Sequence, residues 1–85
     1  MKIRVRYFAS VRETLGVSEE WVSLPESVRT VGDVLAFLRE RGKDWADALS
    51  EEKGLKTACN LKMTGPAALL TEGCEVAFFP PVTGG

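Results

Sequence analysis

Apolar and basic side chains alternate at the start of the chain, which predicts a strand with one buried face. Ile3, Val5 and Tyr7 form the apolar set of this segment, residues 2–8. A second alternation over residues 20–24 predicts another strand. Because few residues separate the two segments, we expect the second strand to return antiparallel to the first.

A short helix is predicted between these two strands. Ser10 and Glu13 have the spacing of a capping box, in which the two side chains accept hydrogen bonds from free backbone N–H groups of the first turn. We therefore expect Ser10 to be the N-cap of a helix over residues 11–15. Gly16 follows where a left-handed residue commonly ends a helix.

A longer helix is predicted after Thr30, with Thr30 as its N-cap and Asp33 at the third helical position. Gly42 has the place of the residue that ends it. Trp45 and Leu49 are four residues apart and predict one further helical turn. The long helix is expected to cover a sheet. Its apolar residues recur at helical spacing: Val31, Val34, Leu35, Phe37 and Leu38.

The second half of the chain is predicted to contain strands and turns. Residues 55–63 alternate again, which predicts one strand or two short ones. Residues 71–73 have the composition of a turn, and residues 75–79 that of a last strand. This last strand is apolar on both faces. We expect it either in the centre of the sheet or with one face left for a partner.

The order of these elements predicts the fold class. Strands and helices are mixed without a repeated βαβ unit, which favours an α+β fold with one mixed sheet and one long helix packed across it. This is the β-grasp, or ubiquitin-like, arrangement. We expect a β-grasp domain over residues 1–79 and a flexible, reactive C-terminal tail over residues 80–85 that projects from it.

The amino-acid composition excludes several classes of function but says little about the fold. The formal net charge of the 85 residues is −1, which argues against nucleic acid or a membrane as a partner. No apolar stretch approaches the ~18 residues of a membrane span, and the N-terminus lacks the apolar core of a signal peptide. We expect a soluble, cytoplasmic protein.

The sequence lacks the residue combinations that nucleophilic catalysis and metal binding usually require. The sequence contains no histidine, so Ser-His and Cys-His pairs are excluded and no metal site is expected. Cys59 and Cys74 do not form a C-x-x-C pair, and we expect two reduced thiols. The carboxylates are scattered along the chain, so no paired general acid and base is predicted.

Candidate chemistry concentrates in the final segment EVAFFPPVTGG, residues 75–85. Pro80 and Pro81 have no backbone N–H, so they end the sheet and favour an extended tail. At ~3.3 Å per residue, the six residues from Pro80 onward reach about 20 Å, far enough to enter the active site of a partner. Gly84 and Gly85 have no side chains, so a narrow channel can close around them and the terminal carboxylate is unhindered. The alternative is a frayed terminus without function.

This final segment resembles the C-terminus of the molybdopterin synthase small subunit, a family of sulfur carriers. The segment YFASVRETLG, residues 7–16, resembles the first strand and short helix of the same family. The resemblance covers essentially the whole chain, and residues 61–70 are its least family-like part.

The resemblance implies a route for sulfur through Gly85. An E1-like adenylating enzyme uses ATP to adenylate the terminal carboxylate, and a persulfide sulfur donor then displaces AMP and leaves a thiocarboxylate. The tail next enters the large catalytic subunit of a heterotetramer, where the sulfur attacks a cyclic pyranopterin monophosphate to build the dithiolene of molybdopterin. The carrier holds no permanent cofactor. The inserted tail residues are Pro80, Pro81, Val82, Thr83 and Gly84.

The resemblance also implies a docking surface. Phe8, Met63 and Phe79 are expected to face the large subunit, with burial in an ordinary core as the alternative for each. Three other functions remain open for a domain with this tail. They are a sulfur carrier of another pathway, such as thiamine synthesis, a ubiquitin-like modifier that forms isopeptide bonds to lysines, and a scaffold whose tail is irrelevant.

Overall fold

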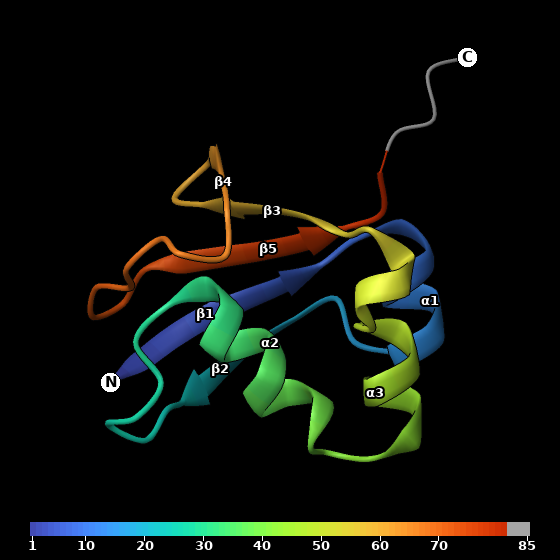
Figure 1. Ribbon diagram of the computed structural model, residues 1–85, viewed down its shortest axis with the longest axis horizontal. Helices are drawn as coiled ribbons and strands as arrows, with labels where there is room; N and C mark the ends of the chain where they lie inside the picture. The colour runs from blue at the N-terminus through green and yellow to red at the C-terminus, as the bar shows by residue number, and fades with distance from the viewer. Residues whose placement is uncertain (82–85) are drawn as a thin grey trace.

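One mixed sheet forms the centre of the computed structural model, which describes residues 1–81 (Figure 1). Its strands are β1 (Lys2–Tyr7), β2 (Glu19–Ser23), β3 (Lys56–Cys59), β4 (Lys62–Thr64) and β5 (Glu75–Phe79). Their order across the sheet is β2-β1-β5-β3-β4. β5 pairs parallel with β1 and antiparallel with β3, whereas the pairs β1–β2 and β3–β4 are antiparallel. β5 is therefore central in the sheet, one of the two places predicted for a strand that is apolar on both faces.

The helices gather on one side of this sheet. They are α1 (Ala9–Leu15), α2 (Val31–Arg39), α3 (Lys43–Ala48) and the short 3-10 helix η1 (Glu51–Lys53). α2 crosses the sheet, and α1 packs against α3 at the end of the sheet toward which β1 and β5 run (Figure 1). The predicted α+β class, with a mixed sheet and a helix packed across it, is therefore confirmed, although α2 has only nine residues.

The core lies between α2 and one face of the sheet, as the alternation predicts. Ile3, Val5 and Tyr7 of β1 are at most 1% exposed, and the facing β5 residues Val76 and Phe78 are fully buried. Residues of the opposite parity are exposed or half-buried, with Ala77 as the exception. The helices contribute mainly the following buried side chains: Val11, Val31, Val34, Leu38 and Ala48.

The N-terminus of α2 forms where its capping residues predict it. The Thr30 hydroxyl accepts a hydrogen bond from the Asp33 N–H at 3.1 Å, and the Asp33 carboxylate accepts from the Thr30 N–H at 3.1 Å. This reciprocal pair satisfies two backbone donors that the helix leaves free. The C-terminus differs from the prediction, because α2 ends at Arg39 and Gly42, with φ of 151°, is instead the N-cap of α3.

The start of α1 corrects the predicted cap. Phe8 is the N-cap and makes no side-chain capping hydrogen bond, and the helix begins at Ala9, so Ser10 lies inside its first turn. Ala9 has a φ of 52°, in the left-handed region that a residue with a Cβ seldom adopts. The turn at Ala9 starts the helix before Ser10 can cap it. The end of the helix is confirmed, since Gly16 is left-handed with φ of 72°.

Residues 55–63 form two short strands joined by a tight hairpin. Cys59 of β3 pairs with Lys62 of β4, which leaves a two-residue turn of Asn60 and Leu61. Both have positive φ, 49° and 70°. The backbone therefore follows the type I′ pattern that matches the twist of an antiparallel pair. Within residues 1–81, no helix has the length and apolar character needed to cross a membrane.

Candidate functional site

The face of the sheet away from α2 carries an apolar patch, which we define as Phe8, Ala58, Met63, Ala77 and Phe79. Ala58 lies directly opposite Ala77 on one side and opposite Met63 on the other. These three side chains form a row across β5, β3 and β4. Phe79 follows Ala77 on the same face of β5 by strand parity. The patch therefore spans three neighbouring strands.

Two aromatic rings form the end of the patch nearest the tail. Phe8 and Phe79 contact edge to face, with 6.4 Å between ring centroids and an angle of 87° between planes. The Arg6 guanidinium lies over the Phe8 ring, 5.1 Å from its centroid. Both phenylalanines are half-buried, so each presents part of its ring to solvent. This geometry leaves an apolar surface beside the last residue of β5.

The structure brings the three predicted docking residues onto one face. Phe8 and Phe79 touch, and Met63 lies at the far end of the alanine row, with 64% of its surface exposed. Met63 is therefore outside the core, and the other two border solvent. That these residues contact a partner stays a prediction. Sequence reasoning missed Ala58 and Ala77 as members of the same surface, because strand period alone does not say which strands are neighbours.

Charged side chains border the patch on β1, β2 and β5. Arg4 pairs with Glu19, and the guanidinium groups of Arg4 and Arg6 each lie 3.8 Å from a carboxylate oxygen of Glu75. These groups largely neutralise one another. Exposed pairs of this kind contribute little stability, and their main effect at an interface is on orientation and association rate.

The chain leaves β5 beside α1. Pro80 is half-buried and borders a small cavity of about 90 Å³ that is also lined by Val11, Thr14 and Leu55. Pro81 follows and is exposed. Val82, Thr83, Gly84 and Gly85, for which we predict tail insertion and the reacting carboxylate, lie outside the described residues. Their roles and the division into residues 1–79 and 80–85 therefore stay predictions.

A partly exposed polar cluster around the buried Tyr7 joins the helices to the sheet from the other side. The Tyr7 hydroxyl donates to a Glu20 carboxylate oxygen at 2.9 Å, and the Arg41 guanidinium donates to the same oxygen at 2.7 Å. The Arg41 guanidinium also lies over the Trp45 ring, 4.5 Å from its centroid. Burial, then the hydrogen bond to Glu20, raises the pKa of Tyr7 far above its ordinary value. The cluster is satisfied within the domain and offers no free reactive group.

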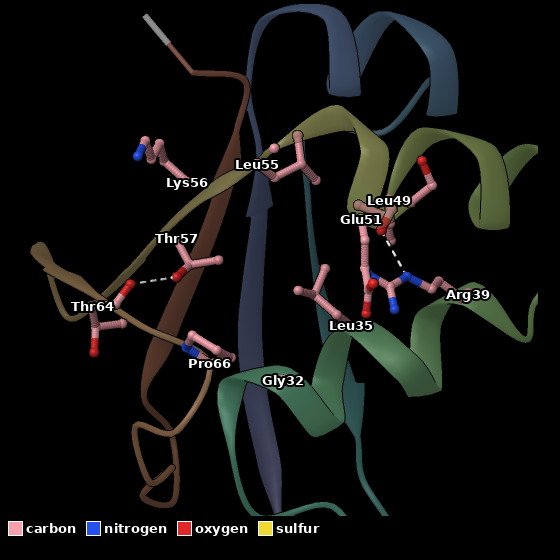
Figure 2. Close-up of a pocket in the computed structure, with 12 residues that line it drawn as sticks. Gly32, Leu35, Arg39, Leu49, Glu51, Leu55, Lys56, Thr57, Thr64 and Pro66 are labelled. Carbon is pink, nitrogen blue, oxygen red and sulfur yellow. Dashed lines mark hydrogen bonds between the residues drawn. The ribbon is translucent and has the colours of Figure 1, made fainter.

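A cavity of about 410 Å³ lies between α2 and the β3–β4 hairpin (Figure 2). Leu35, Leu49 and Leu55 supply apolar walls, and the Arg39 side chain donates to the Leu49 carbonyl at 2.7 Å (Figure 2). Among residues 1–81, none of the predicted site residues borders this cavity. Phe8, Met63 and Phe79 lie instead on the opposite face of the sheet.

The two cysteines are free thiols in the structure. Cys74 is 3% exposed and Cys59 is half-buried. Burial, and then the nearby Cys74 side chain, raises the pKa of the Cys59 thiol, which disfavours a reactive thiolate. Among residues 1–81, no cluster of three or more His, Cys, Asp or Glu side chains could hold a metal ion.

Comparison with known proteins identifies relatives over the whole chain. The ThiS family matches residues 5–85. The molybdopterin synthase sulfur carrier subunits of Escherichia coli and Haemophilus influenzae are 40% and 37% identical over 83 residues, which covers 98% of this chain and 99% of each relative. Small archaeal modifier protein 3 of Haloferax volcanii is 32% identical over 93 residues and covers both chains fully.

Solved structures with the same fold include a modifier and a subunit complex. SAMP1 of Haloferax volcanii superposes with a TM-score of 0.76 at 24% identity, and covers 100% of both chains. A chain from the protein-protein complex of subunits 1 and 2 of molybdopterin-converting factor of Helicobacter pylori superposes with a TM-score of 0.65 at 22% identity, again over both full chains. These likenesses confirm the β-grasp fold.

Proposed function

Because this chain belongs to the ThiS family, we propose that it is the sulfur carrier of a molybdopterin synthase, which delivers sulfur on its C-terminal glycine. The observation that carries the proposal is the 37–40% identity, over nearly the full chain, to sulfur carrier subunits of that enzyme. The geometry supports it, because the apolar patch ends at Phe79, the residue directly before Pro80. A partner that covers the patch would meet the start of the tail.

The proposed chemistry takes place at the carboxylate of Gly85. A C-terminal carboxylate has an ordinary pKa of about 3.5, so it is ionised at neutral pH and is a poor electrophile until it is activated. An E1-like adenylating enzyme would supply ATP, whose α-phosphate the carboxylate attacks with release of pyrophosphate. A persulfide donor then forms a C–S bond as AMP leaves, and reductive loss of the donor's other sulfur atom, with a thiol as reductant, leaves the thiocarboxylate on Gly85.

The large catalytic subunit is the proposed acceptor of this thiocarboxylate. Docking on the apolar patch would hold the tail beside the acceptor site at high effective concentration, which replaces a bimolecular encounter with a local one. The six residues from Pro80 to Gly85 span at most about 20 Å, so the acceptor site must lie within that distance of Phe79. There the sulfur would form a C–S bond to cyclic pyranopterin monophosphate, and water would cleave the resulting thioester to return the Gly85 carboxylate. Two successive carriers would complete one dithiolene.

A protein modifier is the second candidate, favoured by the 32% identity to small archaeal modifier protein 3. Both functions begin with an activated glycine carboxylate. They differ in the group that attacks it, which is a sulfur donor for the carrier and a lysine amine for the modifier. A carrier for another pathway, such as thiamine synthesis, shares the thiocarboxylate and differs in the final acceptor.

Intact mass spectrometry distinguishes these functions. The protein is incubated with ATP, an activating enzyme, a persulfide donor and a thiol reductant, and a gain of about 16 Da marks the exchange of one oxygen for sulfur. Conjugates of higher mass would support the modifier instead. The thiocarboxylated protein is then mixed with a purified large subunit and its pterin substrate. Formation of molybdopterin supports the proposed pathway, and its absence in the presence of thiocarboxylate favours another pathway.

Deletion of Gly85 is expected to abolish sulfur transfer, because Gly84 would then end the chain one residue short of the reaction site. The deletion leaves in place every core residue among residues 1–81, so the circular dichroism spectrum and melting temperature are expected to stay unchanged. Transfer is measured by the mass shift and by molybdopterin formation. A variant without Gly85 that still transfers sulfur at the normal rate would contradict the proposed role.

A further inference from the structure

The tip of the β3–β4 hairpin contains a leucine that breaks the local rule for its position. A type I′ turn requires positive φ at both central residues, and it prefers asparagine followed by glycine. Asn60 fits the first position with φ of 49°. Leu61 occupies the second with φ of 70°, where its Cβ is crowded against the following carbonyl oxygen. Glycine would satisfy this backbone without strain.

Burial of the Leu61 side chain does not offset this backbone strain. Leu61 is 86% exposed, more than any other large hydrophobic residue that the structure describes. Met63 is exposed to 64% and Leu69 to 72%, and both have ordinary negative φ. Side chains stabilise a fold in proportion to the apolar area that they remove from water. Leu61 removes little, so the isolated domain gains almost nothing from a leucine at this place.

The hairpin tip is held firmly to the centre of the sheet. The Asn60 N–H donates to the Glu75 carbonyl at 2.8 Å, and the Asn60 side-chain oxygen accepts from the Glu75 N–H at 2.9 Å. These two bonds tie the turn to the start of β5. A residue displayed on a fixed turn loses little conformational freedom when it binds, which favours its use as an anchor.

The position of Leu61 continues the apolar patch. The row of Ala77, Ala58 and Met63 runs across the sheet to β4, its edge strand. Leu61 precedes Met63 by two residues along the same hairpin. The Leu61 side chain at the hairpin tip is therefore within reach of a partner surface that covers Met63.

We propose that Leu61 is a docking residue that inserts into an apolar hollow of the large subunit which receives the tail. This inference rests on the proposed function and extends the contact surface beyond Phe8, Met63 and Phe79 to the hairpin tip. The strain at Leu61 is kept in the free carrier because the side chain is buried only in the complex. The free domain would therefore be more stable with glycine at position 61, whereas the complex is more stable with leucine there.

Replacement of Leu61 by glycine separates the two preferences. The Leu61→Gly variant is expected to melt at a higher temperature than the wild type, because the turn loses its strain. Its affinity for a purified large subunit, measured by titration calorimetry, is expected to fall about tenfold, as for an apolar anchor at an interface. The Leu61→Asn variant, which also tolerates positive φ, is expected to show the same loss of affinity.

Leu69→Ala is the matched control. Leu69 is also highly exposed, but it pairs with Thr30 beside α2, on the covered side of the sheet. Its replacement is expected to leave the affinity unchanged. If both Leu61 variants bind the large subunit as tightly as the wild type, the inference is wrong, while normal thiocarboxylate formation would leave the proposed function standing. If the wild type neither binds the large subunit nor forms a thiocarboxylate, both fail.

Discussion

The two faces of the sheet differ in what their side chains do, and β5 shows the difference in adjacent residues. Phe78 is fully buried and stacks beside Tyr7, with 6.4 Å between ring centroids. Phe79 points to the other face and contacts Phe8 at the border of solvent. The covered face therefore holds the domain together, whereas the open face keeps apolar area available for a partner. Residue type alone does not separate these roles.

The largest effect is expected on the covered face. Phe78→Ala should lower the free energy of unfolding by about 3–5 kcal/mol, because it leaves a cavity in a core that cannot collapse fully. Denaturant titration measures the loss. A small domain has a limited stability margin, so partial unfolding at room temperature is an expected result. A loss below about 1 kcal/mol would remove the contrast between the two faces.

A different result is expected for the neighbouring residue on the open face. Phe79→Ala should lower the free energy of unfolding by only about 1 kcal/mol, since much of its ring already borders solvent. Its affinity for the large subunit should fall at least tenfold, as expected for an aromatic anchor. Titration calorimetry measures the affinity, and the Gly85 deletion provides a variant with an intact patch. Unchanged binding by Phe79→Ala would show that the patch is not the docking surface.

The buried hydroxyl on the covered face predicts a pH dependence. Tyr7 keeps its proton in the folded state, whereas an unfolded tyrosine loses it above a pKa of 10.0. The contribution of Tyr7 to the free energy of unfolding is therefore complete below pH 10. Above pH 10 it decreases by at most about 1.4 kcal/mol per pH unit. Tyr7→Phe should remove this slope and cost about 1 kcal/mol at neutral pH.

Tyr7 is the one tyrosine in the sequence, so phenolate absorbance reports on it without overlap from another tyrosine. Unfolding titrations of the wild type and of Tyr7→Phe at a series of pH values give the two slopes. Equal slopes above pH 10, or phenolate absorbance in the folded wild type near pH 10, would contradict the buried hydrogen bond to Glu20.

The smallest effect is expected among the charges of the open face. Glu75→Gln weakens the ion pairs with Arg4 and Arg6, which are partly exposed. The free energy of unfolding should change by less than about 1 kcal/mol, and the change should shrink as salt is added. A loss of unfolding free energy as large as that of Phe78→Ala would mean that the open face also stabilises the fold.

Much of the fold could be predicted because local rules and tertiary structure agree. Thr30 and Asp33 cap α2 as their spacing indicates, and the alternation of Ile3, Val5 and Tyr7 reports the buried face of β1. Ser10 misled the prediction because the left-handed turn at Ala9 starts α1 earlier than a capping box would. That turn depends on how β1 and α1 are placed relative to each other. This placement is a tertiary feature that the local sequence pattern does not predict.

The candidate site could be predicted only in part. Phe8, Met63 and Phe79 follow from resemblance and do fall on one face, but the alanine row between them depends on which strands are neighbours. Parity gives the face of Ala58 and Ala77, and only the register places them side by side. Leu61 was not singled out, because its positive φ becomes visible only once the hairpin is seen.

The central position of β5 has a consequence for the synthesis of this protein. β5 pairs with β1, and Arg4 lies opposite Glu75, about seventy residues later in the chain. Until β5 has emerged from the ribosome, β1–β2 and β3–β4 are two separate antiparallel pairs, and isolated two-stranded pairs are at best marginally stable. A polypeptide cut short before Glu75 lacks this central strand, so it cannot mature into a stable domain and is left open to proteases. Folding thus acts as a check that the segment preceding the tail has been made.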